Sequence, residues 1–436
     1  MSDTYKTSLI IVDDRGRVAA RQHPAGPSLP EVEVEPGRVG ISLSKAVREQ
    51  LHLETFCLVL PETAGGSYHT LRLQRSNMKL PTAYVWADPT ELSDSKTVEN
   101  MLAHFSPADT EFARFAWYTQ VLVWLDAEIA KLGYTCRRLE QWNGRVGGVL
   151  LRVLTDGPDF WFKAVSDFNA REFWIAQLLS ERHPDYFPKV LAAQPRWNAF
   201  LLGNVQGEEL NDTDNLEVWK QVAQLLADVQ TDWSGDSTKL LEAGAADLRP
   251  STLLNNIPVF LEQVAQSMSR QEKTVPAVLN KGDLITLGEQ LGDLCTEITK
   301  LPFSEGLANA DFSPHNTIIT AGGPVFIDWA EACVSFPPIV GEYLWNRMVI
   351  EVPNRKQWQD ALREAYFKRW AEHYDSSAVE SAAQLVPAFA IFALLTFLHE
   401  REGDGPSRYD PYLRSLARRL KQEVNLLQTL SCLKAS

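Results

Sequence analysis

Short runs of apolar, β-branched residues recur through the first hundred positions and predict strands. The run at residues 8–12 is followed by the turn-forming Asp13–Gly16 segment and then by Val18, a pattern typical of a β-hairpin. Residues 43–53 interrupt the strands with helical spacing. Further strands are expected at residues 56–60, 69–73 and 83–86. Together these elements predict a small α/β domain over residues 1–108.

From residue 109 onward the apolar spacing becomes helical. Phe112, Val123 and Ile129 belong to a run at helical intervals, and Gly133 is a plausible end for it. We therefore expect a long helix over residues 109–132 that joins two domains.

Two regions of different character follow this helix. Strands are predicted at residues 148–155 and 159–163, around an Asp156–Gly157 turn, and a helix at residues 167–182, so residues 109–203 should form a β-rich lobe. Residues 204–436 should form a helical lobe with two strands. The expected helices are 216–233, 253–268, 285–300, 358–373 and 378–400, and the strands are 316–320 and 325–327. The predicted fold class is α+β.

Composition narrows the range of partners. The 436 residues are 45% hydrophobic and 22% charged, which is ordinary for a soluble globular protein, and the net charge of -14 is unsuited to binding nucleic acid over a large surface. The acidic charge either favours a cationic small substrate or only keeps the protein dispersed. Five widely spaced cysteines and the lack of an unbroken membrane-length apolar run predict a cytoplasmic protein without a membrane partner.

The densest candidate chemistry lies in residues 308–332. Asp311 precedes Asn316 by five positions, a short hairpin follows, and Asp328 comes directly after an apolar strand. Magnesium prefers oxygen ligands of this kind, and phosphoryl transfer also needs a carboxylate that accepts the proton of the attacking hydroxyl. We assign the general base to Asp311 and the metal ligands to Asn316 and Asp328. By itself, the 311–316 stretch would also suit an ordinary turn.

At these residues the sequence resembles the aminoglycoside phosphotransferase and choline kinase-like family. The family's catalytic loop H-G-D-x-x-x-x-N is matched by residues 309–316, and its I-D-W metal motif by residues 327–329. The resemblance covers about residues 113–350. It implies a protein kinase-like, two-lobed fold, ATP or GTP and magnesium as cofactors, and transfer of the γ-phosphoryl group to a hydroxyl of a small molecule. The acceptor stays open, because this fold accepts many small alcohols.

Two departures from the family pattern keep a second hypothesis open. Asn309 and Ala310 stand where the family has His and Gly. A pseudokinase that binds nucleotide, or an interaction module without catalysis, is therefore the alternative to an active kinase.

The resemblance also implies nucleotide-binding residues upstream. Lys163 at a strand end and Glu172 in the next helix are similar to the family's phosphate-binding lysine and its glutamate partner. A solvated strand-end charge is the alternative for Lys163. The glycine-rich turn over the phosphates would use Asn143, Gly144 and Gly147, although a plain glycine turn explains it equally well. The hinge that contacts the nucleotide base would consist of Leu202, Gly203, Asn204 and Val205.

The N-terminal domain loosely resembles a degenerate Nudix domain. Residues 48–53 match part of its R-E-U-x-E-E box, but His52 and Leu53 stand at the positions of metal-binding glutamates. Pyrophosphate hydrolysis needs clustered carboxylates, so that activity is not expected. A binding role or homodimer formation is expected instead, and an unrelated small α/β domain is the alternative.

Overall fold

The computed structural model describes residues 4–13, 15–24, 26–35, 39–58, 68–74, 79–103, 112, 115–145, 147–402 and 409–435. By its internal contacts the chain forms two compact units. The first consists of Met1–Phe173 with Pro188–Asn204, and the second of Trp174–Phe187 with Val205–Ser436.

The first unit contains a six-stranded sheet in the order β4-β5-β1-β2-β6, with β3 also paired to β1. Its strands are β1 (Tyr5–Val12), β2 (Val18–Arg21), β3 (Glu31–Val34), β4 (Thr55–Cys57), β5 (Tyr68–Leu73) and β6 (Tyr84–Ala87). Val12 pairs with Val18, which confirms the predicted hairpin. The strands predicted at 69–73 and 83–86 are confirmed as β5 and β6. Strand β4 ends at Cys57, and residues 59–60 of the predicted strand lie outside the described residues.

Strand β1 has a hydrophobic core on both of its faces. Leu9 is buried in a cluster with residues of α1 (Val39–Leu51), and its neighbour Ile10 in a separate cluster with residues of α2 (Ser95–Ala103). Successive side chains of a strand point to opposite faces, so the two helices cover opposite sides of the sheet. Helix α1 ends two residues before the predicted position, and His52 follows it with a left-handed φ of 55°.

A second, antiparallel sheet of the first unit has the order β10-β11-β9-β8-β7. Its strands are β7 (Cys136–Arg145), β8 (Gly148–Thr155), β9 (Phe160–Val165), β10 (Val190–Gln194) and β11 (Ala199–Gly203). Helix α3 (Phe115–Lys131) packs on it through Val121 and Leu125, which share a core with Leu151 and Phe162. Residues 109–111 and 113–114 of the predicted linker helix lie outside the described residues. Both predicted strands of this region are confirmed.

Helix α4 (Arg171–Arg182) is preceded by a separate 3-10 turn at Asp167–Asn169, where one helix was predicted over residues 167–182.

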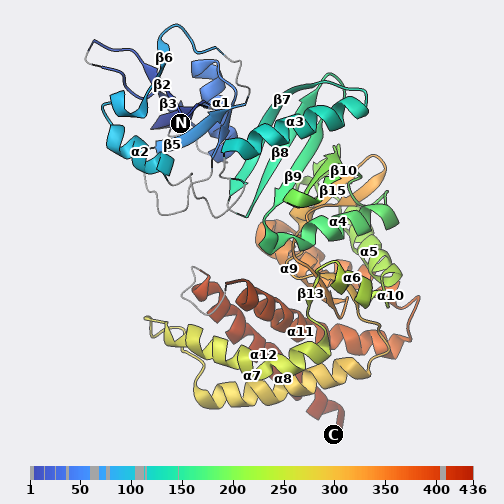
Figure 1. Cartoon of the computed structure of the whole chain (residues 1–436). Helices are drawn as coiled ribbons and strands as arrows, with labels where there is room; N and C mark the ends of the chain where they lie inside the picture. The colour runs from blue at the N-terminus through green and yellow to red at the C-terminus, as the bar shows by residue number, and fades with distance from the viewer. Residues whose placement is uncertain are drawn as a thin grey trace. The chain divides into compact units, whose positions relative to one another are not determined.

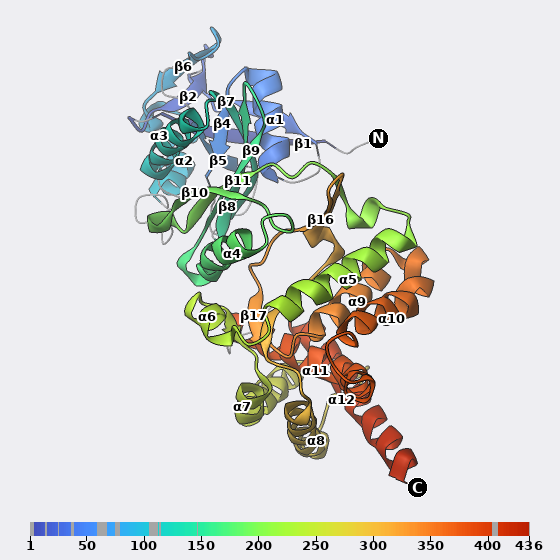
Figure 2. The ribbon, with the colours of Figure 1, turned by 90° about the vertical axis from the view of Figure 1, so that its right-hand side faces the viewer.

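The second unit is mostly helical, as predicted. Its further helices are α5 (Leu216–Asp232), α6 (Ser237–Glu242), α7 (Pro250–Ser269), α8 (Lys281–Lys300), α9 (Ile339–Glu351), α10 (Gln359–Trp370), α11 (Ser376–Glu402) and α12 (Asp410–Ala435). Helix α8 begins at a capping box between Asn280 and Asp283. Helices α7, α8, α11 and α12 pack against one another (Figure 1). Helices α5, α9 and α10 form a second group (Figure 2).

Helix α9 has no counterpart among the predicted elements. Its residues from Ile339 to Trp345 are all buried, including the glutamate Glu342. A helix that is buried all round has no polar face, so it lacks the amphipathic periodicity by which a helix is recognised in a sequence.

Helix α11 contains a segment, Ser376–Arg401, that is long and apolar enough to cross a membrane. The apolar window is 67% buried inside the protein. A core helix of a soluble protein has this property, because its neighbours take the place of lipid.

Two small sheets of the second unit carry the residues of the candidate site. One consists of β12 (Glu208–Glu209), β15 (Thr317–Thr320) and β16 (Gly323–Phe326), and the other of β13 (Ala246–Asp247), β17 (Ala332–Ser335) and β14 (Gly306–Asn309). The two strands predicted beside Gly322 and Gly323 are thus confirmed as β15 and β16, although Asn316 and Ile327 lie just outside them.

Candidate active site

Asp311 is the second residue after β14, and two hydrogen bonds from backbone N–H groups hold the chain there. The N–H of Ala310 donates to the carbonyl of Glu331 at 2.9 Å. The N–H of Asp311 itself donates to the side-chain oxygen Oδ1 of Asn309 at 3.0 Å, and Asn309 is fully buried. Asn309, one of the two departures from the family pattern, therefore anchors the backbone of the proposed base.

The β15–β16 hairpin brings Asn316 and Asp328 together. Thr317 pairs with Phe326 at the open end of the hairpin, and the N–H of Ile327 donates to the carbonyl of Asn316 at 2.8 Å. The pairing thus continues to the residue before Asp328. Asn316 and Asp328, twelve positions apart in the sequence, therefore lie next to the paired ends of two adjacent strands.

Asp328 has an unusual backbone conformation. Its φ is 57°, in the left-handed region that costs an L-residue other than Gly, Asn or Asp about 1–2 kcal/mol. The next residue, Trp329, is buried and packs on Phe187 and Phe312, with ring centroids 5.5 and 6.3 Å away. This packing holds the chain in place where it turns at Asp328, a site where strain often accompanies function.

Asp311 forms an ion pair with Arg347 of α9. One nitrogen of Arg347 donates to Oδ1 of Asp311, and no described residue donates to Oδ2. Burial lowers the pKa of Arg347, but the charge and hydrogen bond of Asp311 outweigh it and raise that pKa. Burial raises the pKa of the nearby Tyr412 phenol, with Arg347 opposing and Asp311 adding to this shift. Because Arg347 contacts only Oδ1, the second oxygen of the Asp311 carboxylate, Oδ2, is available to a further partner.

The loop after Asp311 is tied down by Glu351 at the end of α9. Ser313 Oγ donates to both oxygens of Glu351, at 2.9 and 3.2 Å, and Asn211 Nδ2 donates to Glu351 at 2.9 Å. His315 lies 3.6 Å from Glu351 and 2.5 Å from Glu209 on its other side. Glu351 is thus a positioning residue for the segment that separates Asp311 from Asn316.

Replacing Glu351 by alanine is expected to lower kcat by about tenfold, because Ser313 and Asn211 lose a shared charged acceptor and the loop loses its anchor. Turnover kinetics should show a change in kcat with little change in the KM for nucleotide. Glu364→Ala on α10 is the control, because among the described residues the Glu364 carboxylate accepts no hydrogen bond from the loop. Equal kinetics of the two variants would contradict a positioning role for Glu351.

The oxygen donors of the site fit magnesium better than a softer metal. Among the residues that the structure describes there is no group of three His, Cys, Asp or Glu side chains arranged to hold a metal ion. The donors brought together are instead the amide of Asn316 and the carboxylate of Asp328. The Asn316 side chain is half-buried and makes no hydrogen bond to a described residue, so its oxygen is available. Amide and carboxylate oxygens are typical ligands of a hard cation.

In the first unit, the predicted contact between Lys163 and Glu172 is confirmed. The ammonium of Lys163 on β9 forms an ion pair with Glu172 in the first turn of α4. The side chain of Glu172 is only 5% exposed, against 21% for Lys163. A buried carboxylate that orients a partly exposed amine is the arrangement expected for a phosphate-binding lysine.

The predicted phosphate turn is the β7–β8 hairpin. Asn143 pairs with Leu150 and Gly144 with Val149, while residue 146 between the strands lies outside the described residues. The carbonyl of Gly147 accepts from the backbone of Ser166, at 3.1 Å. A Cβ at Gly148 would lie 2.8 Å from the carbonyl oxygen of Ala164, so this glycine serves the close packing of β8 on β9.

The predicted hinge segment runs from β11 to the boundary between the two units, which falls after Asn204. Leu202 pairs with Trp161 and with Val190, and Gly203 donates its N–H to the carbonyl of Lys189 at 3.0 Å. Asn204 accepts a hydrogen bond from the indole of Trp161 at 2.8 Å. Val205 is the first residue of the second unit. The nucleotide contacts of these residues stay predictions.

Sequence reasoning missed Arg347 and Glu351. Both lie on α9, which was not among the predicted helices, four residues apart and so on one face. That spacing of a cation and a carboxylate was the only available signal, and it is common on solvated helices.

No protein-family model and no curated protein matches the chain. Among solved structures, an ethanolamine kinase from Plasmodium vivax superposes with a TM-score of 0.50 at 14% identity, over 75% of this chain and 94% of that one. A choline kinase from Cryptosporidium parvum superposes with a TM-score of 0.51 at 12% identity, over 72% of this chain and 97% of that one. Both are kinases named for a small molecule. The resemblance inferred from the catalytic loop is thereby confirmed at the level of fold, because the chain has a protein kinase-like α+β fold similar to that of these two kinases.

Proposed function

We propose that the protein is a magnesium-dependent kinase that transfers the γ-phosphoryl group of ATP or GTP to a hydroxyl of a small molecule. The observation that supports this most is the Asp311 carboxylate. One of its oxygens is fixed by Arg347 and the other has no donor among the described residues, next to a hairpin that brings Asn316 and Asp328 together. Phosphoryl transfer requires a general base and oxygen ligands for a metal ion, and we assign these roles to Asp311 and to the pair Asn316 and Asp328.

Asp311 Oδ2 accepts the proton of the acceptor hydroxyl as that oxygen attacks the γ-phosphorus. The bond between the γ-phosphorus and the oxygen that bridges it to the β-phosphate breaks, and a phosphate monoester forms. Arg347 limits the rotation of the carboxylate, because one of its nitrogens holds Oδ1 in an ion pair. Asn316 and Asp328 would hold magnesium, and the ion would supply positive charge against the phosphates.

The first unit contributes nucleotide binding in this proposal. Lys163 contacts the α- and β-phosphates, and Glu172 selects the rotamer in which the ammonium points correctly. Asn143, Gly144 and Gly147 lie on the hairpin proposed to cover the phosphates. Backbone groups of residues 202–205 contact the base. A cytoplasmic setting is part of the proposal.

A nucleotide-binding protein without catalysis is the second candidate. Ala310, and the ion pair that occupies one oxygen of Asp311, favour it. The hydrogen bond from Asp311 to Asn309 argues for the active kinase, since it preserves the loop at a position where the family pattern is broken.

Calorimetric titration with magnesium and ATP tests nucleotide binding. The double variant Lys163→Met with Glu172→Gln is expected to bind about tenfold or more weakly than the unchanged protein, because it loses a charged phosphate contact. The second substitution avoids leaving a buried carboxylate without a cation. Lys131→Met is the control, since Lys131 forms an exposed pair with Glu128 in the same unit. Equal affinities would remove Lys163 from the nucleotide site.

Phosphate transfer to hydroxyl compounds, followed by mass spectrometry, then separates the two candidates. Ethanolamine and choline are suitable first acceptors, because the structurally similar kinases are named for them. Binding of nucleotide without turnover on any acceptor would favour the second candidate.

A further inference from the structure

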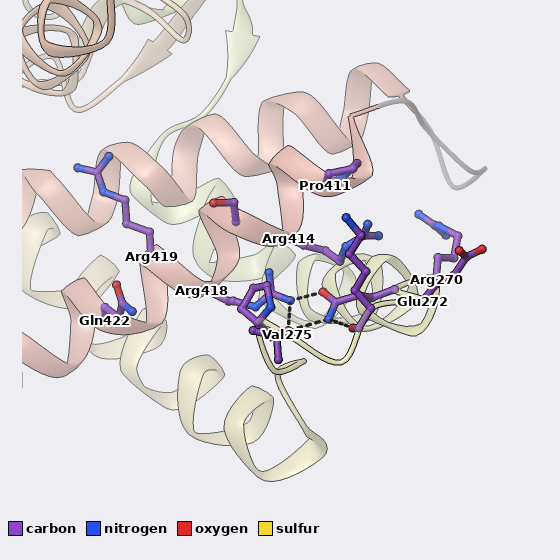
Figure 3. Close-up of a pocket in the computed structure, with 12 residues that line it drawn as sticks. Arg270, Glu272, Val275, Pro411, Arg414, Arg418, Arg419 and Gln422 are labelled. Atoms are coloured by element: carbon purple, nitrogen blue, oxygen red, sulfur yellow. Dashed lines mark hydrogen bonds between the residues drawn. The ribbon is translucent and has the colours of Figure 1, made fainter. Parts of the chain in front are cut away.

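A cavity of about 680 Å³ lies between the end of α7, the segment that follows it and the first half of α12 (Figure 3). It is lined by Arg270, Gln271, Glu272, Lys273, Val275, Pro276, Pro411, Arg414, Ser415, Arg418, Arg419 and Gln422. The residues Asp311, Asn316 and Asp328 are not among them. The three proposed catalytic and metal-binding residues therefore do not form its wall, and its volume is within the range of small-molecule sites.

The lining of this cavity is cationic in a protein whose net charge is -14. Five of its side chains are Arg or Lys, and only one, Glu272, is acidic. Arg270 is neutralised by Asp410, with nitrogen–oxygen distances of 2.7 and 2.8 Å, and Arg419 lies 3.7 Å from Glu423. Within the described part of the chain, Arg414, Arg418 and Lys273 form no ion pair with a carboxylate. An excess of positive charge is left at the cavity wall.

Arg414 and Arg418 are four residues apart on one face of α12. Arg414 donates to the carbonyl of Ser267 at 2.9 Å, and Arg418 to the carbonyl of Ala277 at 2.7 Å. Burial and the like charge of Arg414 lower the pKa of Arg418. These bonds attach the loop to α12, but neutral carbonyls do not remove the repulsion between two guanidinium groups. A bound anion would remove it.

We propose that this cavity binds a small soluble molecule that carries a phosphate group. Guanidinium groups recognise phosphate through charge-assisted, often bidentate, hydrogen bonds. The three unneutralised cations and the carboxylate of Glu272 leave a charge of about +2, which matches a phosphate monoester. A concave site of this volume suits a free metabolite-sized ester rather than the flat surface of a membrane. The proposal does not depend on catalysis by the protein.

Calorimetric titration of the full chain with glycerol 3-phosphate, with glycerol as the uncharged control, tests the proposal. The ester should bind and glycerol should not. Lys273→Ala is expected to weaken binding about threefold to fivefold, and Glu272→Gln to strengthen it by a similar factor, because each changes one charge at a partly solvated site. Both residues are exposed, so folding should persist in both variants. Lys300→Ala, which changes an exposed lysine of α8, should leave the affinity unchanged.

Asp328→Asn controls for binding of the ester at the candidate active site, and it should not alter this affinity. An affinity that responds to Asp328→Asn but not to the changes at residues 272 and 273 would overturn the proposal. So would a lack of binding of the ester, or binding only to vesicles of phosphatidic acid.

Discussion

Replacing Asp311 by asparagine is expected to lower kcat by about 10³-fold while the affinity for nucleotide stays nearly unchanged. The amide cannot accept the proton of the acceptor hydroxyl, and general-base catalysis contributes about 10²–10⁴-fold in enzymes. The shape of the side chain is preserved, so the packing around Arg347 should change little. Steady-state kinetics with an identified acceptor, together with calorimetry for the nucleotide, measure the two quantities separately.

Asp293→Asn on the exposed face of α8 is a matched control for the change of charge. Turnover of Asp311→Asn at the rate of this control would show that another group is the base. A parallel loss of nucleotide affinity and turnover would point to a structural role for the ion pair with Arg347.

Asp328→Asn is expected to lower kcat by about 10²-fold or more and to raise the magnesium concentration needed for half-maximal activity. The variant loses the negative charge that would neutralise the cation, and the neutral amide that replaces it is a weaker ligand for magnesium. Asparagine adopts the left-handed backbone region nearly as readily as aspartate does, so the φ of 57° can persist. The substitution thus isolates the charge from the backbone conformation.

Asp328→Ala is a useful comparison, because alanine adds a backbone cost that asparagine avoids. We expect it to lower the melting temperature in addition to the activity. If Asp328→Asn required no more magnesium than the unchanged protein, Asp328 would not be a metal ligand.

Local patterns in the sequence predicted the chemically important hairpin correctly. Two apolar strands on either side of Gly322 and Gly323 pair over a short separation, so the information that specifies them is local. The pairing of Lys163 with Glu172 was predicted from the resemblance, and the structure confirms the contact. The helix boundaries were less accurate, as the early end of α1 and the separate turn before α4 show.

The role of Asn309 shows a limit of motif comparison. In the sequence this residue is only a departure from a family pattern, which raised the hypothesis of an inactive protein. In the structure its buried side chain accepts a hydrogen bond from the backbone of Asp311. A residue that departs from the family motif can thus still hold the backbone of the catalytic loop, and a comparison of sequences alone does not reveal this contact.

By itself, the sequence determined the α+β class, five helices of the second unit (α5, α7, α8, α10 and α11) and the order of Asp311, Asn316 and Asp328 along a loop and hairpin, because periodicity and turn residues act over a few positions. Only the tertiary structure placed Arg347 on Asp311 and Glu351 on the loop. These contacts join segments more than thirty residues apart through a helix whose first seven residues are all buried. Such a helix owes its place to the packing around it, and no pattern within its own residues records its partners.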